Sequence, residues 1–242
     1  MPHFTSAQQR AVEQLATDLD GVFGPRLESL VVYPGNQGDG SIHSCALVQR
    51  LGFRDLTACL PFTERWHHRG VAVPLMLSAE ELRRTVDVFP LEYSTMLADY
   101  AVVRGTDPLK GLTIPVEDVR RAVEGLAKGH LIHLREGFLE SHGETTRIAR
   151  LVSASAAPLR ALLLHLARLP DAAKGALDTA TPSDESLATM AELRMGVPAA
   201  LIRTVLASSH DGHSTITDPS HMLGSYIDAS QRIWEYVDRW RA

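Results

Sequence analysis

The stretch that decides the fold is VVYPGNQGDGSIHSCALV, residues 31–48. Its apolar beginning predicts the end of a buried strand over 27–33, and its apolar end predicts a second short strand over 45–48. The glycine-rich turn between them could hold a phosphate on its backbone N–H groups. From Gly40 to Phe53, however, the chain contains no Asp or Glu. The stretch therefore predicts the frame of a phosphate site without the carboxylates that would bind Mg²⁺ there.

Helix and strand patterns alternate around this stretch through the first 108 residues. Capping boxes at Thr5 to Gln8 and Ser78 to Glu81 mark two helix starts. The expected helices cover 6–23, 53–68 and 79–86. The expected strands cover 27–33, 45–48, 71–77 and 88–96, with a short edge strand at 101–104. This region predicts a mixed β-sheet with flanking helices.

After Gly105-Thr106-Asp107-Pro108 the remaining patterns are helical. One helix is expected over 116–141, and another over 145–169 with a kink at its internal Pro158. Thr181-Pro182 and Asp218-Pro219 each place a capping residue before a proline and predict two further helix starts. The expected class is α+β, with an α/β domain over 1–108 and an α-helical bundle over 109–242.

Composition narrows the function classes. With 45% hydrophobic and 22% charged residues in 242, the chain has a globular composition. A net charge of -5 gives no overall basic field, so nucleic acid is not an expected partner. No apolar run reaches the roughly 20 residues of a membrane span, and the first residues lack an apolar signal core, so we expect a cytoplasmic protein. Cys45 and Cys59 are expected to be buried thiols.

The order of these elements resembles that of the nucleotidyltransferase superfamily with the polymerase-beta-like fold, in which a helical domain commonly follows. LVVYPGNQGDG, residues 30–40, resembles its strand and Gly-Ser loop. VAVPLMLSAEELRRTVDVFPLEYSTM, residues 71–96, and AVVRGTDPL, residues 101–109, resemble a group of bacterial nucleotidyltransferase-like proteins. The resemblance covers residues 27 to about 170.

The resemblance also implies site residues. In active members the Gly-Ser loop contacts the nucleotide triphosphate, and two carboxylates spaced Asp-x-Asp on the next strand hold divalent metal. It assigns a phosphate or ligand loop to Gly35, Asn36 and Gly38, and the two metal positions to Ser44 and Ala46. Neither metal position is acidic, so the usual active-site motifs are degenerate and no resident metal is expected.

Pro34-Gly35 also stands where the superfamily has Gly-Ser, which removes an N–H donor and a hydroxyl. The first hypothesis is therefore a pseudoenzyme that has lost metal-dependent transfer and keeps a ligand-binding or regulatory role. Its expected ligand is a nucleotide or another small molecule, and no cofactor is expected.

Two alternatives remain open. An active transferase could use Asp39 and Glu92 with Mg²⁺ in a rearranged site, although Asp39 also suits an ordinary turn and Glu92 the polar side of a half-buried strand. A non-catalytic protein could instead use the C-terminal helices as a homodimer or partner surface. His130 and His133 have a helical spacing that permits joint metal binding, but core or interface packing is the favoured interpretation.

Overall fold

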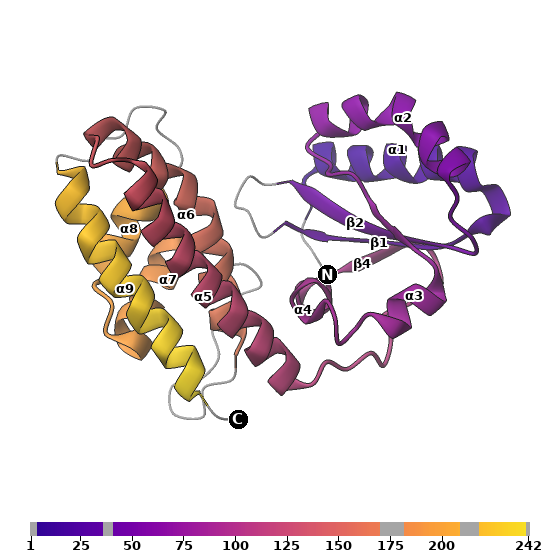
Figure 1. Ribbon diagram of the computed structural model, residues 1–242. Helices are drawn as coiled ribbons and strands as arrows, with labels where there is room; N and C mark the ends of the chain where they lie inside the picture. Colours follow the sequence, from indigo (N-terminus) through magenta and orange to yellow (C-terminus); the bar gives the residue numbers. More distant parts are fainter. Residues whose placement is uncertain (1–3, 36–40, 170–181, 209–217, 241–242) are drawn as a thin grey trace. The chain divides into compact units, whose positions relative to one another are not determined.

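The computed structural model describes residues 4–35, 41–169, 182–208 and 218–240. The chain divides into two compact units, Met1–Pro115 and Val116–Ala242. The first contains a mixed sheet with flanking helices, and the second contains helices that pack together (Figure 1). The expected α+β class is confirmed.

The sheet of the first unit has four strands in the described residues, in the order β3-β2-β1-β4. Their bounds are Leu27–Pro34 for β1, Ile42–Val48 for β2, Leu75–Leu77 for β3 and Ala101–Gly105 for β4. The central strand β1 is antiparallel to both β2 and β4, whereas β3 runs parallel to β2. The register pairs Val32 with Ser44 and Leu30 with Ala46.

Helices cover both faces of this sheet (Figure 1). The helices α1, Ser6–Phe23, and α2, Phe53–His68, lie on one face. The helices α3, Ala79–Arg84, and α4, Pro90–Ala98, lie on the other. Because the side chains of a strand alternate between the two faces, β1 must be apolar at nearly every position to fill both cores.

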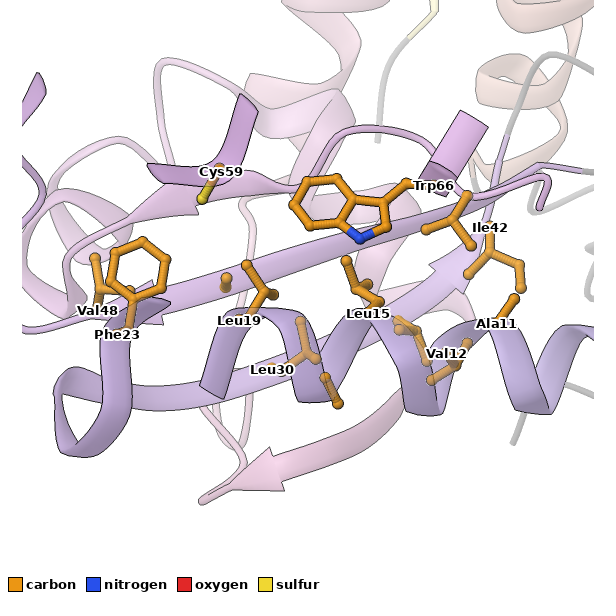
Figure 2. Packing of buried hydrophobic residues seen from close by; sticks show 14 residues of the cluster. Ala11, Val12, Leu15, Leu19, Phe23, Leu30, Ile42, Val48, Cys59 and Trp66 are labelled. Carbon is orange, nitrogen blue, oxygen red and sulfur yellow. The ribbon is translucent and has the colours of Figure 1, made fainter. Parts of the chain in front are cut away.

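The core under α1 and α2 is built around Trp66 (Figure 2). Figure 2 shows Leu15 and Leu19 of α1 gathered with Trp66 and Cys59 of α2. The Trp66 indole N–H donates to the buried carboxylate of Asp18 at 2.8 Å, and Arg65 donates to the same carboxylate at 2.6 Å. Burial raises the pKa of Asp18, but these hydrogen bonds outweigh it and leave the pKa below its usual value.

The second core lies between the sheet and α3 and α4. It contains one set of alternate residues from the two central strands, joined by residues of both helices and of the segment that follows β4. Its buried members are Val31, Tyr33, Cys45, Leu47, Leu82, Tyr93, Met96 and Leu109. Burial raises the pKa of the Cys45 thiol to about 12, so Cys45 is the buried thiol that the sequence predicts.

One expected strand is a helix. The sequence predicts a strand over 88–96, but the segment that begins at Pro90 is α4, with Pro90 in its first turn. Proline lacks an N–H and has a fixed φ that suits a helix start, and the buried residues Pro90, Tyr93 and Met96 follow a helical spacing. The short edge strand expected at 101–104 is confirmed as β4.

The second unit consists of helices in its described residues. Their bounds are Val116–Glu140 for α5, Thr145–Arg168 for α6, Asp184–Met195 for α7, Ala199–Ala207 for α8 and Pro219–Arg239 for α9. The helix α5 packs against α6 and α9. A hydrogen-bonded group lies inside this packing: His130 Nε2 is 2.7 Å from the Tyr226 hydroxyl, which accepts from Ser155 at 3.3 Å.

The helix starts of this unit are predicted with mixed success. Asp218 caps α9 through the His221 N–H, and Pro219 is in the first turn, as expected. The start expected at Thr181-Pro182 is wrong, because α7 begins at Asp184 with Ser183 as its cap. A carboxylate in the first turn suits the helix dipole, which favours the later start.

No helix in the described ranges is long and apolar enough to cross a membrane.

Candidate functional site

The loop between β1 and β2 is held together at its base. The strands pair as far as Pro34 and Ile42, and the Gly35 N–H donates to the Ser41 carbonyl at 3.1 Å. A Cβ atom on Gly35 would lie 2.7 Å from ring atoms of His43, so a larger residue requires that ring to move. The loop residues Asn36, Gly38 and Asp39 lie outside the described residues.

The two positions that the resemblance assigns to metal ligands are interior. Ala46 is fully buried and Ser44 is 2% exposed. Ile42 and Ala46 belong to the core under α1 and α2, and Ser44 lies between them on the same side of β2. The Ser44 Oγ is buried without a hydrogen-bond partner among the described residues. On this side β2 contributes no carboxylate, and the buried Asp18 carboxylate of the same core is already bound by Trp66 and Arg65. This environment does not fit Mg²⁺.

Glu92 lies on the opposite face of the sheet. It is exposed in the first turn of α4, next to the buried Tyr93. Burial raises the pKa of Tyr33, and the nearby Cys45 and Glu92 side chains raise it further. Glu92 is therefore close to the Tyr33 end of β1. The sheet separates it from the side on which Ser44 and Ala46 lie.

The two assigned metal positions and Glu92 thus do not converge. Ser44 and Ala46 point into the core under α1 and α2, whereas Glu92 belongs to the helix that covers the other face. The pairing of Glu92 with Asp39 stays a prediction, since Asp39 is not described.

The histidine pair of α5 does not form a joint site. His130 is buried beside Tyr226, while His133 is exposed on the same helix. Among the described residues, no three His, Cys, Asp or Glu side chains come together closely enough to hold a metal ion. His130 is a packing residue, as the sequence suggested, and its buried ring accounts for a lowered pKa of about 4.

A cavity of about 440 Å³ lies near the other end of the central strands, between the start of β1, α3 and the segment after β4. Its apolar lining includes Leu47, Leu82 and Leu112. Its charged lining includes Arg83 and Lys110. A cavity of this volume is within the range of small-molecule sites.

Several fixed contacts shape the segment after β4. The Ser29 hydroxyl donates to the Thr106 carbonyl at 2.8 Å. The Asp107 carboxylate accepts from the Leu109 N–H at 3.0 Å and from the Tyr100 hydroxyl at 2.9 Å. Gly105 has a φ of +70°, and a Cβ atom there would lie 1.9 Å from the Glu28 carbonyl oxygen, so only glycine fits. This wall of the cavity is therefore preformed and does not require a bound ligand.

The cations of the cavity are available for a ligand. Within the described part of the chain, neither Arg83 nor Lys110 has an ion-pair or hydrogen-bond partner through its side chain. Of the two carboxylates that line the cavity, Asp107 is engaged in the turn, while Glu28 is exposed. The two cations can therefore bind an anion, and Glu28 will oppose it.

Two further hollows are less suited to binding an anion, because several of their charged side chains already bind protein groups. A wider groove of about 620 Å³ is lined by Arg84, Glu80 and Glu81, but Arg84 pairs with Glu80 and Glu81 caps α3. A cavity of about 410 Å³ in the helical unit contains arginines whose guanidinium groups bind protein oxygens. These contacts join Arg194 to Leu166, Arg232 to Gly196 and Arg239 to Glu235.

Comparison with protein-family models and with curated proteins finds no match to this chain. The class defined by the fold is an α+β protein with a mixed sheet and helices.

Sequence reasoning missed the cavity. The sequence of Gly105-Thr106-Asp107-Pro108 indicates only the place where the helical half begins. The available signal was the run from Gly105 to Gly111, in which turn residues surround a lysine. Its convergence with Arg83 of α3 requires the tertiary fold.

Proposed function

We propose that this chain is a nucleotidyltransferase-like protein that does not carry out metal-dependent nucleotidyl transfer and that binds a small anionic ligand instead. The observation that carries the proposal is the location of Ser44 and Ala46 in the core under α1 and α2, with Glu92 beyond the opposite face of the sheet. Metal-assisted transfer needs carboxylates that hold the ion beside the triphosphate. The resemblance of residues 30–40 and 71–96 to the superfamily supports a nucleotidyltransferase-like origin for this domain.

The cavity that contains Arg83 and Lys110 supports the binding role. Two cations beside an apolar lining suit a ligand with a phosphate or carboxylate group and an apolar body. A nucleotide is one member of this chemical class. A phosphate monoester and a monocarboxylate are smaller members whose anionic group can bind Arg83 and Lys110 without a metal ion.

Incubation with labelled ATP, CTP, GTP or UTP in the presence of Mg²⁺ or Mn²⁺ is expected to yield no nucleotidylated product above a no-protein blank. The physical reason is the lack of paired carboxylates on β2 to bind the metal. Product formation would be measured by mass spectrometry of the protein and of added acceptors. A labelled product that disappears in the Glu92→Gln variant would establish the active-transferase alternative and overturn the proposal.

Binding of anionic probes is expected to depend on the charges of the cavity. Benzoate and phenyl phosphate should bind, and Arg83→Ala or Lys110→Ala should each weaken them about 10-fold, because each removes a cation worth ~1 kcal/mol or more. Glu28→Gln should tighten binding, since it removes the opposing charge. Isothermal titration calorimetry would measure all of these affinities.

Two controls make this experiment specific. Benzyl alcohol is a neutral probe of similar shape and should bind no better to the parent chain than to Arg83→Ala. Arg84→Ala changes the neighbouring arginine, which pairs with Glu80 outside this cavity, and should leave benzoate affinity unchanged. Equal loss of affinity in Arg84→Ala and Arg83→Ala would show that the cavity is not the site.

A further inference from the structure

The exposed surface of α2 carries three large apolar side chains. Phe53 is 82% exposed, Leu60 is 64% exposed and Leu56 is 44% exposed. Spacings of three, four and seven residues place them along one side of the helix. Cys59 and Trp66 pack inward from an adjoining side of α2, since Cys59 is three residues from Leu56. No described residue covers this exposed apolar side, which is therefore available for a second contact.

We propose that α2 is a homodimerisation helix, which packs antiparallel against α2 of a second copy of this chain. The proposal does not depend on the anion-binding role, because α2 contributes no residue to that cavity. A two-fold axis that crosses the helix near Cys59 makes the apolar side self-complementary. Leu60 then lies at the centre of the contact, and Phe53 lies toward each end.

The charges on α2 favour a second copy of α2 as the partner and an antiparallel direction of packing. Arg54 and Glu64 are ten residues apart and equidistant from Cys59, which corresponds to about 15 Å along the helix. An antiparallel pair brings Arg54 of each copy toward Glu64 of the other, whereas a parallel pair in register brings like charges together. Arg54 has no ion-pair partner in the described residues, and Glu64 contacts only the exposed His68, at 3.7 Å. Both charges are thus available across the interface.

The expected dimer is weak. A helix of 16 residues is about 24 Å long, so one helix from each copy buries less area than a standard interface of about 1,600 Å². Such contacts dissociate at micromolar or higher concentrations. The dimer should therefore form as the protein concentration rises.

Sedimentation velocity of the full chain from about 1 µM to about 500 µM tests the proposal. The weight-average mass should rise from 26.5 kDa toward twice that value. Leu60→Asp should abolish the rise, while Leu193→Asp, an equally exposed leucine at 64% on α7, should leave it unchanged. Circular dichroism would check that both variants are folded. A chain that stays monomeric at 500 µM, or a dimer that Leu60→Asp does not affect, overturns the proposal.

Charge reversal provides a second test that does not alter the apolar side chains. Arg54→Glu and Glu64→Arg should each weaken the dimer at least 3-fold, because each places like charges together across the two-fold axis. The double variant Arg54→Glu with Glu64→Arg should recover the parent affinity. Recovery is specific to a contact between two copies of α2 in the antiparallel direction. Failure of the double variant to recover affinity contradicts this arrangement.

Discussion

Lowering the pH from 6.5 to 4 is expected to destabilise the helical unit by ~3 kcal/mol for each of two buried histidines. His130 and His165 both have pKa values of about 4 instead of 6.5. Burial is the main cause in each case, and the charges of His133 and Arg168 add to it respectively. The summed loss is comparable with the whole stability of a typical domain.

The direction of this pH effect on stability follows from the number of protons bound by the folded and the unfolded chain. Well above pH 6.5 the two histidines are neutral in both the folded and the unfolded chain, so they contribute no pH dependence there. Between pH 6.5 and 4 the unfolded chain binds a proton at each histidine and the folded chain does not, so the free energy of unfolding falls with pH. The described histidines of the first unit are half-buried or exposed, so the helical unit should respond more strongly.

Urea unfolding of the chain labelled with 5-fluorotryptophan would measure this effect in each unit by ¹⁹F NMR. Trp66 reports on the first unit, and Trp234 and Trp240 report on the second. His130→Gln, which can still bind the Tyr226 hydroxyl, should remove about half of the pH dependence. His165→Leu should remove the remainder.

The matched control is His133→Gln, which changes an exposed histidine on the same helix. It should leave most of the pH dependence in place. Equal pH dependence in the parent chain and in the double variant of His130 and His165 would contradict the assignment.

Replacement of Ser44 by Asp is expected to cost roughly 3 to 5 kcal/mol of stability without creating transfer activity. This substitution supplies a carboxylate at a position that the resemblance assigns to a metal ligand. In this chain, however, Ser44 is 2% exposed among apolar side chains, and an unpaired carboxylate there loses its hydration. Chemical denaturation with and without Mg²⁺ would measure the cost and any stabilisation by metal.

Ser44→Ala is the companion variant. The Ser44 hydroxyl is buried without a hydrogen-bond partner in the part of the chain that the structure describes, so its removal should be neutral or slightly stabilising. If Ser44→Asp were as stable as Ser44→Ala and bound Mg²⁺, this side of β2 would be accessible, and the proposed loss of transfer would no longer hold.

Local signals account for the parts of the fold that could be predicted. The capping boxes at Thr5 and Ser78 are made within four residues of chain, and both form as expected. Buried strands can also be recognised from their nearly continuous apolar sequence, because β1 must fill two cores. The segment that begins at Pro90 was misread, since a short apolar run fits a strand or a helix and only its packing under the sheet decides between them.

The candidate site was less predictable than the fold. The missing carboxylates at Ser44 and Ala46 are visible in the sequence, but the direction of those side chains depends on which face each helix covers. Arg83 and Lys110 come from separate segments, and no local pattern links them. The sequence pattern predicts Glu92 on a strand, whereas the structure has it in the first turn of α4.

The sheet with a core on each face has a consequence for how its sequence can change. Nearly every side chain of β1 supports one of two cores, so random substitution in this strand is opposed by packing whether or not the protein is a catalyst. The same holds for Cys45 and Ala46 of β2, which face opposite cores. A stretch such as VVYPGNQGDGSIHSCALV can therefore keep the appearance of an enzyme motif after selection for catalysis has ended. Its likeness to an enzyme motif then reflects the burial of the two strands.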